Sequence, residues 1–223
     1  MTYDVLTFGN EGNPVVIIDD FHPDPTALRN AAFELQYSSL TPGFPGLRAP
    51  FDPNYMGSAM PLLQKILVDV FGLTKGVVLS KCCASIVTLK PEELRPSQSI
   101  PHIDGSDPNQ IALLHYIDMP EKGGTGFYRH KETGFEAITP QREPRYRDAL
   151  RPMYERGSFS TGAYVTDTNN TFEKIGCVEG CYNRMAIYRG NNLHSGDINP
   201  ENDFSEDPRK ARLSINTFLI GRS

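Results

Sequence analysis

Hydrophobic and polar residues follow two different spacings along this chain, and the first part contains both kinds. A short apolar run at residues 14–18 predicts a buried strand. Asp24 followed by Pro25 is typical of a helix start, because aspartate caps and proline fits the first helical position. Residues 58–71 carry apolar side chains at intervals of three and four, which predicts a second helix with one apolar face. We expect both helices to pack on the outside of a sheet.

From residue 76 onward, short apolar or alternating segments follow one another with turn residues between them. These predicted strands cover residues 77–79, 84–89, 111–117, 126–128, 172–178, 184–188 and 212–220. One further helical stretch is predicted at residues 143–154. Because long helices do not separate most of the strands, antiparallel pairing and closure into a jelly-roll are favoured. We predict a mainly β fold with flanking helices and a double-stranded β-helix core of the jelly-roll, cupin-like type.

The chain has 223 residues, which fits one domain, and its hydrophobic content of 39% allows a sizeable core. The prediction is a single domain over residues 1–223, with a helical N-terminal support layer at 1–75 and the jelly-roll core at 76–223. Residues 38–54 have no regular pattern, and residues 129–170 interrupt the run of strands. We expect them to form the rim that selects a substrate.

Charge and cysteine content narrow the class of protein. The formal net charge of −5 argues against a nucleic-acid partner. An arginine-rich stretch at residues 142–156 is interpreted as a solvated helix face or loop, in preference to an anion-binding patch. No apolar run of signal-peptide or membrane-span form occurs, so a soluble, cytoplasmic protein is expected. The four cysteines include an adjacent pair and a C-x3-C pair, which favours reduced thiols over a zinc site.

Two histidines and one aspartate point to a metal. His102 and Asp104 are one residue apart, so on an extended segment both side chains face the same way. His194, far downstream, would complete one face of an octahedron. This is the two-histidine, one-carboxylate set of non-haem Fe(II) oxygenases, which leaves positions open for cosubstrate and oxygen. His115 lies mid-strand and is expected to be a core histidine.

The last predicted strand alternates between apolar and polar residues. Arg212, Ser214 and Asn216 share one face, and Leu213 and Ile215 share the other. A guanidinium with a nearby hydroxyl makes a carboxylate receptor, since it donates two parallel charge-assisted hydrogen bonds. The opposite orientation, with the polar residues in water, fits the same alternation. The position of the strand shortly after His194 favours the receptor.

Together these motifs resemble the 2-oxoglutarate/Fe(II)-dependent oxygenases, on the prolyl-4-hydroxylase-like side of that superfamily. The resembling segments, between residues 84 and 220, are His102-x-Asp104, residues 114–118 leading into the glycine-rich 123–127, His194-Ser195-Gly196, and Arg212-x-Ser214. Each motif is short, and their order and spacing carry the resemblance.

The resemblance implies a hydroxylase that uses Fe(II), 2-oxoglutarate as cosubstrate, and O2. It assigns His102, Asp104 and His194 to the metal, and Arg212 and Ser214 to the far carboxylate of 2-oxoglutarate. The chain departs from the family in two respects. Arg212 follows His194 at a longer interval, filled by the acidic loop 199–208, which is interpreted as an insertion. The family's tyrosine upstream of the metal pair is missing; Tyr116 is proposed to complete the cosubstrate pocket, with Tyr128 as the other choice.

Two other functions stay open at this point. One is a cupin-like metal enzyme that does not use 2-oxoglutarate, and the other is a non-catalytic jelly-roll binding module. The expected partner is a small-molecule or peptidyl substrate, with neither nucleic acid nor membrane. An exposed edge strand would allow a homodimer.

Overall fold

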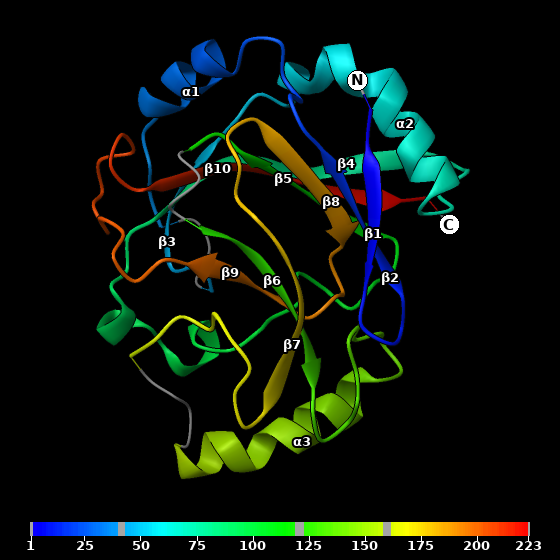
Figure 1. Ribbon diagram of the computed structural model, residues 1–223, viewed down its shortest axis with the longest axis vertical. Helices are drawn as coiled ribbons and strands as arrows, with labels where there is room; N and C mark the ends of the chain where they lie inside the picture. Colours follow the sequence, from blue (N-terminus) through cyan, green and yellow to red (C-terminus); the bar gives the residue numbers. More distant parts are fainter. Residues whose placement is uncertain (1, 40–42, 119–122, 158–161, 223) are drawn as a thin grey trace.

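Two antiparallel sheets form the centre of the protein, as a computed structural model shows (Figure 1). The structure describes residues 2–39, 43–118, 123–157 and 162–222. The large sheet has seven strands in the order β1-β2-β8-β5-β10-β4-β3, and the small sheet has three in the order β7-β6-β9. The strands are β1 (Asp4–Phe8), β2 (Asn13–Ile18), β3 (Gly46–Pro50), β4 (Val77–Val87), β5 (Gln110–Tyr116), β6 (Gly123–His130), β7 (Phe172–Val178), β8 (Arg184–Arg189), β9 (His194–Ile198) and β10 (Arg212–Gly221).

This architecture confirms the predicted mainly β, jelly-roll core with flanking helices. The predicted strands at 77–79 and 84–89 are one continuous strand, β4, which pairs with β10 along its length. A register shift occurs between Phe218 and Leu219 on β10. On β4 this bulge falls between the two predicted segments. It interrupts the alternation there, so the sequence pattern looks like two strands.

The N-terminal part differs from the predicted helical support layer at residues 1–75. It supplies three strands: β1 and β2 form one edge of the large sheet, and β3 forms the other. β2 pairs with β8, and β3 pairs with β4. The strand predicted at residues 14–18 is β2. β1 and β3 were missed because they are five-residue edge strands with little alternation. The single-domain assignment stays a prediction.

Within the described residues, three α-helices cover the sheets (Figure 1). They are α1 (Pro25–Phe33), α2 (Met60–Asp69) and α3 (Glu143–Arg156), with short 3-10 turns at Pro53–Ala59, Pro91–Glu93 and Pro96–Gln98. The carboxylate of Asp24 accepts a hydrogen bond from the Ala27 amide at 2.9 Å, as the predicted cap requires. None of the helices in the described ranges combines the length and apolarity needed to cross a bilayer.

Side chains alternate between the two faces of the large sheet, so the protein has one core under the helices and another between the two sheets. Ile111 and Leu113 of β5 pack with Leu63 and Ile66 of α2 on the outer face of the large sheet. Leu213 and Ile215 of β10 pack with α1 in the same way. The inner core joins the two sheets and contains Val15, Ala112, Leu114, Tyr116, Phe127, Val178, Ala186 and Tyr188. Polar residues on the inner side of β10 are therefore turned into the space between the sheets.

Candidate metal centre

The segment that carries His102 and Asp104 precedes β5 and lies against the start of β9. The His102 amide donates to the His194 carbonyl at 2.8 Å, and the His194 amide donates back at 2.9 Å. The Asp104 amide donates to the Gly190 carbonyl at 2.8 Å. These bonds hold the segment extended, so residues two apart turn their side chains the same way.

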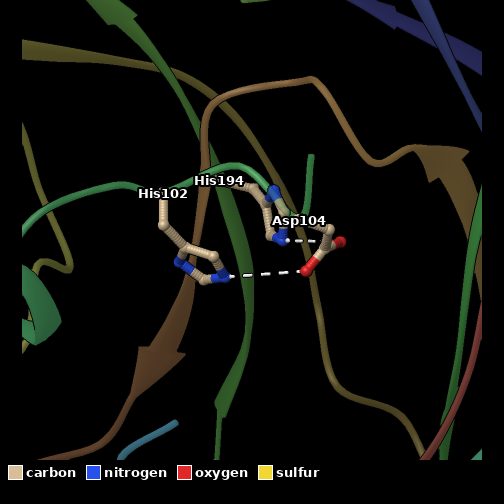
Figure 2. Close-up of side chains that lie close together, drawn as sticks. All are labelled: His102, Asp104 and His194. Carbon is tan, nitrogen blue, oxygen red and sulfur yellow. Dashed lines mark ion pairs between the residues drawn. The ribbon is translucent and has the colours of Figure 1, made fainter. Parts of the chain in front are cut away.

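Three side chains converge on one point, as Figure 2 shows. The His194 Nε2 atom lies 3.6 Å from Asp104 Oδ2, and the His102 Nε2 atom lies 4.0 Å from Asp104 Oδ1. One donor atom from each residue lies within 4.8 Å of the others. Two imidazoles and a carboxylate at such spacing leave room for one ion at bonding distance from all three.

A hydrogen bond determines which ring nitrogen of His194 carries the proton. Its Nδ1 atom lies 2.8 Å from the Asn192 carbonyl oxygen, which can only accept, so Nδ1 carries the proton. In the neutral ring, Nε2 then presents a lone pair toward Asp104. The facing Asp104 Oδ2 atom is buried and has no hydrogen-bond partner in the described part of the chain. Two electron-rich atoms facing each other without a proton between them fit a cation.

Burial is the main influence on the pKa of two of these groups. Burial raises the pKa of Asp104, with the charges of His194 and Arg48 opposing it. Burial lowers the pKa of His102 well below its usual value, and His194 and Arg48 lower it further. The His102 side chain is 52% exposed, but it borders a cavity, so the surrounding chain still disfavours the charged ring. A neutral imidazole is the form that binds a metal.

The cavity next to these side chains has a volume of about 390 Å³. β10 contributes Arg212, Ser214 and Asn216 to its wall, which is the face that alternation predicted. Arg212 is 7% exposed and donates from Nη2 to the Gly124 carbonyl at 3.0 Å, while its buried Nε has no partner among the described residues. A buried guanidinium with an orphaned donor fits an incoming carboxylate.

Tyr116 lies opposite Ser214 across the sheet, behind the residues that line the cavity. Its hydroxyl lies 2.7 Å from the hydroxyl of Thr125, which does line the cavity, and its role in the cosubstrate pocket stays a prediction. Its ring lies 5.7 Å from Cζ of Arg212, so it supports that side chain from the side. Tyr128, the other choice, is fully buried and donates to the Val165 carbonyl.

Tyr188 of β8 and Arg48 of β3 line the cavity and were missed in the sequence. Burial raises the pKa of Tyr188 well above its usual value, followed by the charge of Asp104, so its hydroxyl stays protonated. Tyr188 lies in a predicted strand, β8, but both faces of that strand are buried. The sequence therefore shows no alternation that would indicate to which face the Tyr188 side chain points. Arg48 lies in a glycine- and proline-rich stretch where no regular pattern could mark a strand.

Comparisons with known proteins extend the fold assignment. A family profile described as "Family of unknown function (DUF6445)" matches residues 1–219. No curated protein matches the sequence. HygX from Streptomyces hygroscopicus with nickel and 2-oxoglutarate bound is 16% identical, with a TM-score of 0.54 over 94% of this chain and 84% of that one.

A second HygX structure, with nickel, 2-oxoglutarate and hygromycin B bound, is 15% identical at a TM-score of 0.54, over 94% of this chain and 83% of that one. A Pseudomonas putida prolyl-4-hydroxylase is 13% identical at a TM-score of 0.49, over 96% and 95% of the two chains. The likeness to HygX, at these identities, is one of fold.

Proposed function

On the premise that this chain belongs to DUF6445, a family of unknown function, we propose that it is a 2-oxoglutarate- and Fe(II)-dependent dioxygenase. In this proposal it hydroxylates an unactivated C–H bond of a small-molecule or peptidyl substrate. The observation that carries the proposal is the convergence of two imidazoles and one carboxylate beside a cavity that also contains a buried arginine.

His102, Asp104 and His194 would hold the iron. Their donor set suits Fe(II), and the unpartnered oxygen of Asp104 is where a cation is needed. When bound, Fe(II) and 2-oxoglutarate would activate O2, with one oxygen atom entering succinate as 2-oxoglutarate loses CO2 and the other entering the C–H bond of the substrate. The chain itself keeps His194 in the metal-binding tautomer through the Asn192 carbonyl.

Arg212 and Ser214 would hold the far carboxylate of 2-oxoglutarate. Arg212 can donate two parallel bonds, and Ser214, now bonded to Asn216 Oδ1 at 2.9 Å, can turn its hydroxyl to the ligand. The protonated hydroxyl of Tyr188 borders the same cavity and offers a third donor. The HygX structures, which contain 2-oxoglutarate and nickel in a related fold, support this use of the cavity.

Aromatic side chains form the wall of the cavity next to His194. Phe127 and Tyr188 pack edge to face with ring centroids 5.1 Å apart, and Tyr188 packs against His194 at 5.0 Å. A dry wall beside the metal protects the reaction from side reactions with solvent. The rim toward the substrate includes Phe44 and Tyr164, from the two stretches expected to form it.

Four free cysteines, Cys82, Cys83, Cys177 and Cys181, support a reducing compartment such as the cytoplasm. Homodimer formation and the absence of a nucleic-acid partner stay predictions.

Calorimetric titration of the full chain tests the proposal. With Mn(II) bound, N-oxalylglycine, an unreactive mimic of 2-oxoglutarate, should bind to the wild type. Asp104→Ala removes a metal ligand, so its metal affinity should fall by more than roughly 10–100-fold. That is the loss expected when a residue that only hydrogen-bonds to a ligand is removed. Arg212→Gln should keep the metal and weaken N-oxalylglycine by about 10–100-fold, because a charge-assisted bond contributes about 1.5–3 kcal/mol.

Asp69→Ala is the matched control, since this exposed acid pairs with Lys65 on α2. It should bind Mn(II) and N-oxalylglycine as the wild type does. Metal binding with no response to N-oxalylglycine would favour a cupin-like metal enzyme that does not use 2-oxoglutarate. Equal metal affinity in wild type and Asp104→Ala would overturn the metal site itself.

A further inference from the structure

Asn216 of β10 borders the cavity two residues after Ser214, and one hydrogen bond holds its side chain. The Ser214 hydroxyl donates to Asn216 Oδ1 at 2.9 Å. The amide nitrogen, Nδ2, has no partner among the described residues. Because residues two apart on a strand share a face, Arg212, Ser214 and Asn216 line one wall in that order. Asn216 thus adjoins the pocket assigned to the far carboxylate of 2-oxoglutarate.

The hydrogen bond between Ser214 and Asn216 can run in either direction. A serine hydroxyl both donates its one proton and accepts, and a side-chain amide has an oxygen that accepts and a nitrogen that donates. Half a turn about χ2 of Asn216 exchanges Oδ1 and Nδ2, and this torsion has a broad, two-fold preference. Nδ2 would then donate to Ser214 Oγ. Both bonds join neutral groups, so the two arrangements are close in free energy.

Two other side-chain amides of this protein lack such freedom. Gln98, which also borders the cavity, accepts at Oε1 from the Arg95 amide at 2.8 Å. Asn183 accepts from the His22 amide at 2.9 Å and donates to the His22 carbonyl at 3.0 Å. A backbone amide only donates and a carbonyl only accepts, so each of these side chains has one stable orientation. Asn216 differs, because its partner is a hydroxyl that does both.

A carboxylate next to Arg212 would decide between the two arrangements. Hydrogen bonds to a charged acceptor are about twice as strong as those between neutral groups, so the single proton of Ser214 would turn to the carboxylate. Asn216 Oδ1 would then lose its donor, while Ser214 Oγ keeps a lone pair that can accept. The turned amide restores the pair, with Nδ2 donating to Oγ. Hydrogen bonds in such a chain polarise one another, which strengthens the hold of Ser214 on the ligand.

We propose that Asn216 is a positioning residue whose side-chain amide turns when 2-oxoglutarate binds. In the free protein Nδ2 faces the cavity; with the cosubstrate bound, Nδ2 supports Ser214 and Oδ1 takes its place. The part of the cavity left for the substrate then meets a hydrogen-bond acceptor instead of a donor. Binding of one ligand thus changes the surface offered to the other. The inference rests on the proposed function, since it places 2-oxoglutarate beside Arg212 and Ser214.

Nuclear magnetic resonance tests the turn of the amide directly. The full chain, labelled with ¹⁵N, is loaded with Zn(II), a diamagnetic ion that two imidazoles and a carboxylate can bind. N-oxalylglycine at saturation should move the side-chain amide signals of Asn216, assigned through its own Cβ. The Asn183 signals should stay, because both partners of that amide are backbone groups. In Ser214→Ala, saturated in the same way, the Asn216 signals should move far less, since no hydroxyl changes its role.

Calorimetric titration of variants measures what the turn contributes to binding. The side chain of Asn216→Asp accepts but does not donate, so it keeps the Ser214 proton and should weaken N-oxalylglycine by about tenfold or more. Its negative charge also repels the ligand, and the same change made in Ser214→Ala measures that repulsion alone. The loss there should be smaller by about fivefold or more.

Two further variants complete this comparison. Asn216→Leu has a similar size and no polar atoms, so it leaves Ser214 free to turn and should weaken N-oxalylglycine less than Asn216→Asp does. Asn54→Asp is the matched control, because it makes the same chemical change at an exposed position outside the cavity. It should bind N-oxalylglycine as the wild type does.

The outcomes distinguish this inference from the proposed function. Failure of N-oxalylglycine to bind the wild type overturns both. Binding that leaves the Asn216 signals of the wild type in place overturns the role of Asn216 alone, and needs no variant. A movement of equal size in Ser214→Ala also overturns it, because the ligand then acts on Asn216 without the hydroxyl. Equal losses from Asn216→Asp in the two backgrounds overturn it as well, because charge alone then explains them.

Discussion

A neutral imidazole is buried at the centre of the large sheet, at His115. The side chain is fully buried and its Nε2 atom donates to Asn183 Oδ1, 3.1 Å away. It stacks on the Tyr55 ring with centroids 5.8 Å apart. Burial lowers the pKa of His115 to about 3, and the bond to Asn183 opposes the shift. His115 is thus a core histidine, as its mid-strand position indicated.

The depressed pKa predicts a pH dependence of stability. The unfolded chain takes up a proton near pH 6.5, and the folded chain takes it up only near 3. The contribution of His115 to the free energy of unfolding is therefore fully present above the pKa of the unfolded chain. It declines as the pH falls toward the pKa of the folded chain. Between about pH 6.5 and pH 3 the loss approaches about 1.4 kcal/mol per pH unit.

Chemical denaturation of wild type and His115→Gln at a series of pH values measures this loss. Glutamine can still donate to Asn183 but does not titrate. The free energy of unfolding of His115→Gln should therefore fall less steeply with decreasing pH than that of the wild type. Identical slopes for the two proteins would show that His115 does not contribute. Carboxylates titrate in both proteins and cancel in the difference.

At the scale of elements, β6 depends on the close approach of its neighbour β7. It lies between β7 and β9 in the small sheet, and a Cβ atom on Gly124 would lie 2.0 Å from the Val178 carbonyl oxygen. The contact is with backbone, so it cannot be relieved by turning a side chain. The strand predicted at residues 126–128 is longer in the structure, because the glycine-rich segment before it is also part of β6.

Gly124→Ala should lower the free energy of unfolding by more than about 2 kcal/mol, since the strands must separate. Because Arg212 donates to the Gly124 carbonyl, the same change should weaken N-oxalylglycine binding. Gly57→Ala is the control, because a Cβ there meets nothing within 4 Å. It should change stability by less than about 0.5 kcal/mol. Equal effects of the two changes in urea denaturation would contradict the packing argument.

At the scale of the whole molecule, the metal centre joins parts that are far apart in the sequence. His102 and Asp104 precede β5 of the large sheet, and His194 begins β9 of the small sheet (Figures 1 and 2). An ion bound by all three would link the two sheets. A ligand that binds only the folded chain stabilises it, by about 2.7 kcal/mol at a hundredfold excess over its dissociation constant.

Mn(II) at such an excess should therefore raise the melting temperature of the chelator-treated protein by roughly 5–10 °C. Differential scanning calorimetry measures the shift, and Asp104→Ala should abolish it. A shift of the same size in Asp104→Ala would mean that the metal binds elsewhere.

Local pattern was sufficient for several parts of this protein. The spacing of His102 and Asp104, the capped helix at Pro25 and the alternation of β10 each depend on neighbours along the chain. Side-chain direction in a strand or helix repeats with a known period, so these features could be predicted from the residues alone. The run of short strands without long helices between most of them likewise predicted the jelly-roll.

Other features depend on residues that meet only in the folded chain. Arg48 and Tyr188 enter the cavity because β3 and β8 take particular places in the sheet. Edge strands β1 and β3 exist through pairing with β2 and β4. The sequence alone determined which groups could bind a metal and a carboxylate, since that follows from residue type and local period. The tertiary structure decided which of them share one cavity, because strand order and burial are set by contacts between distant segments.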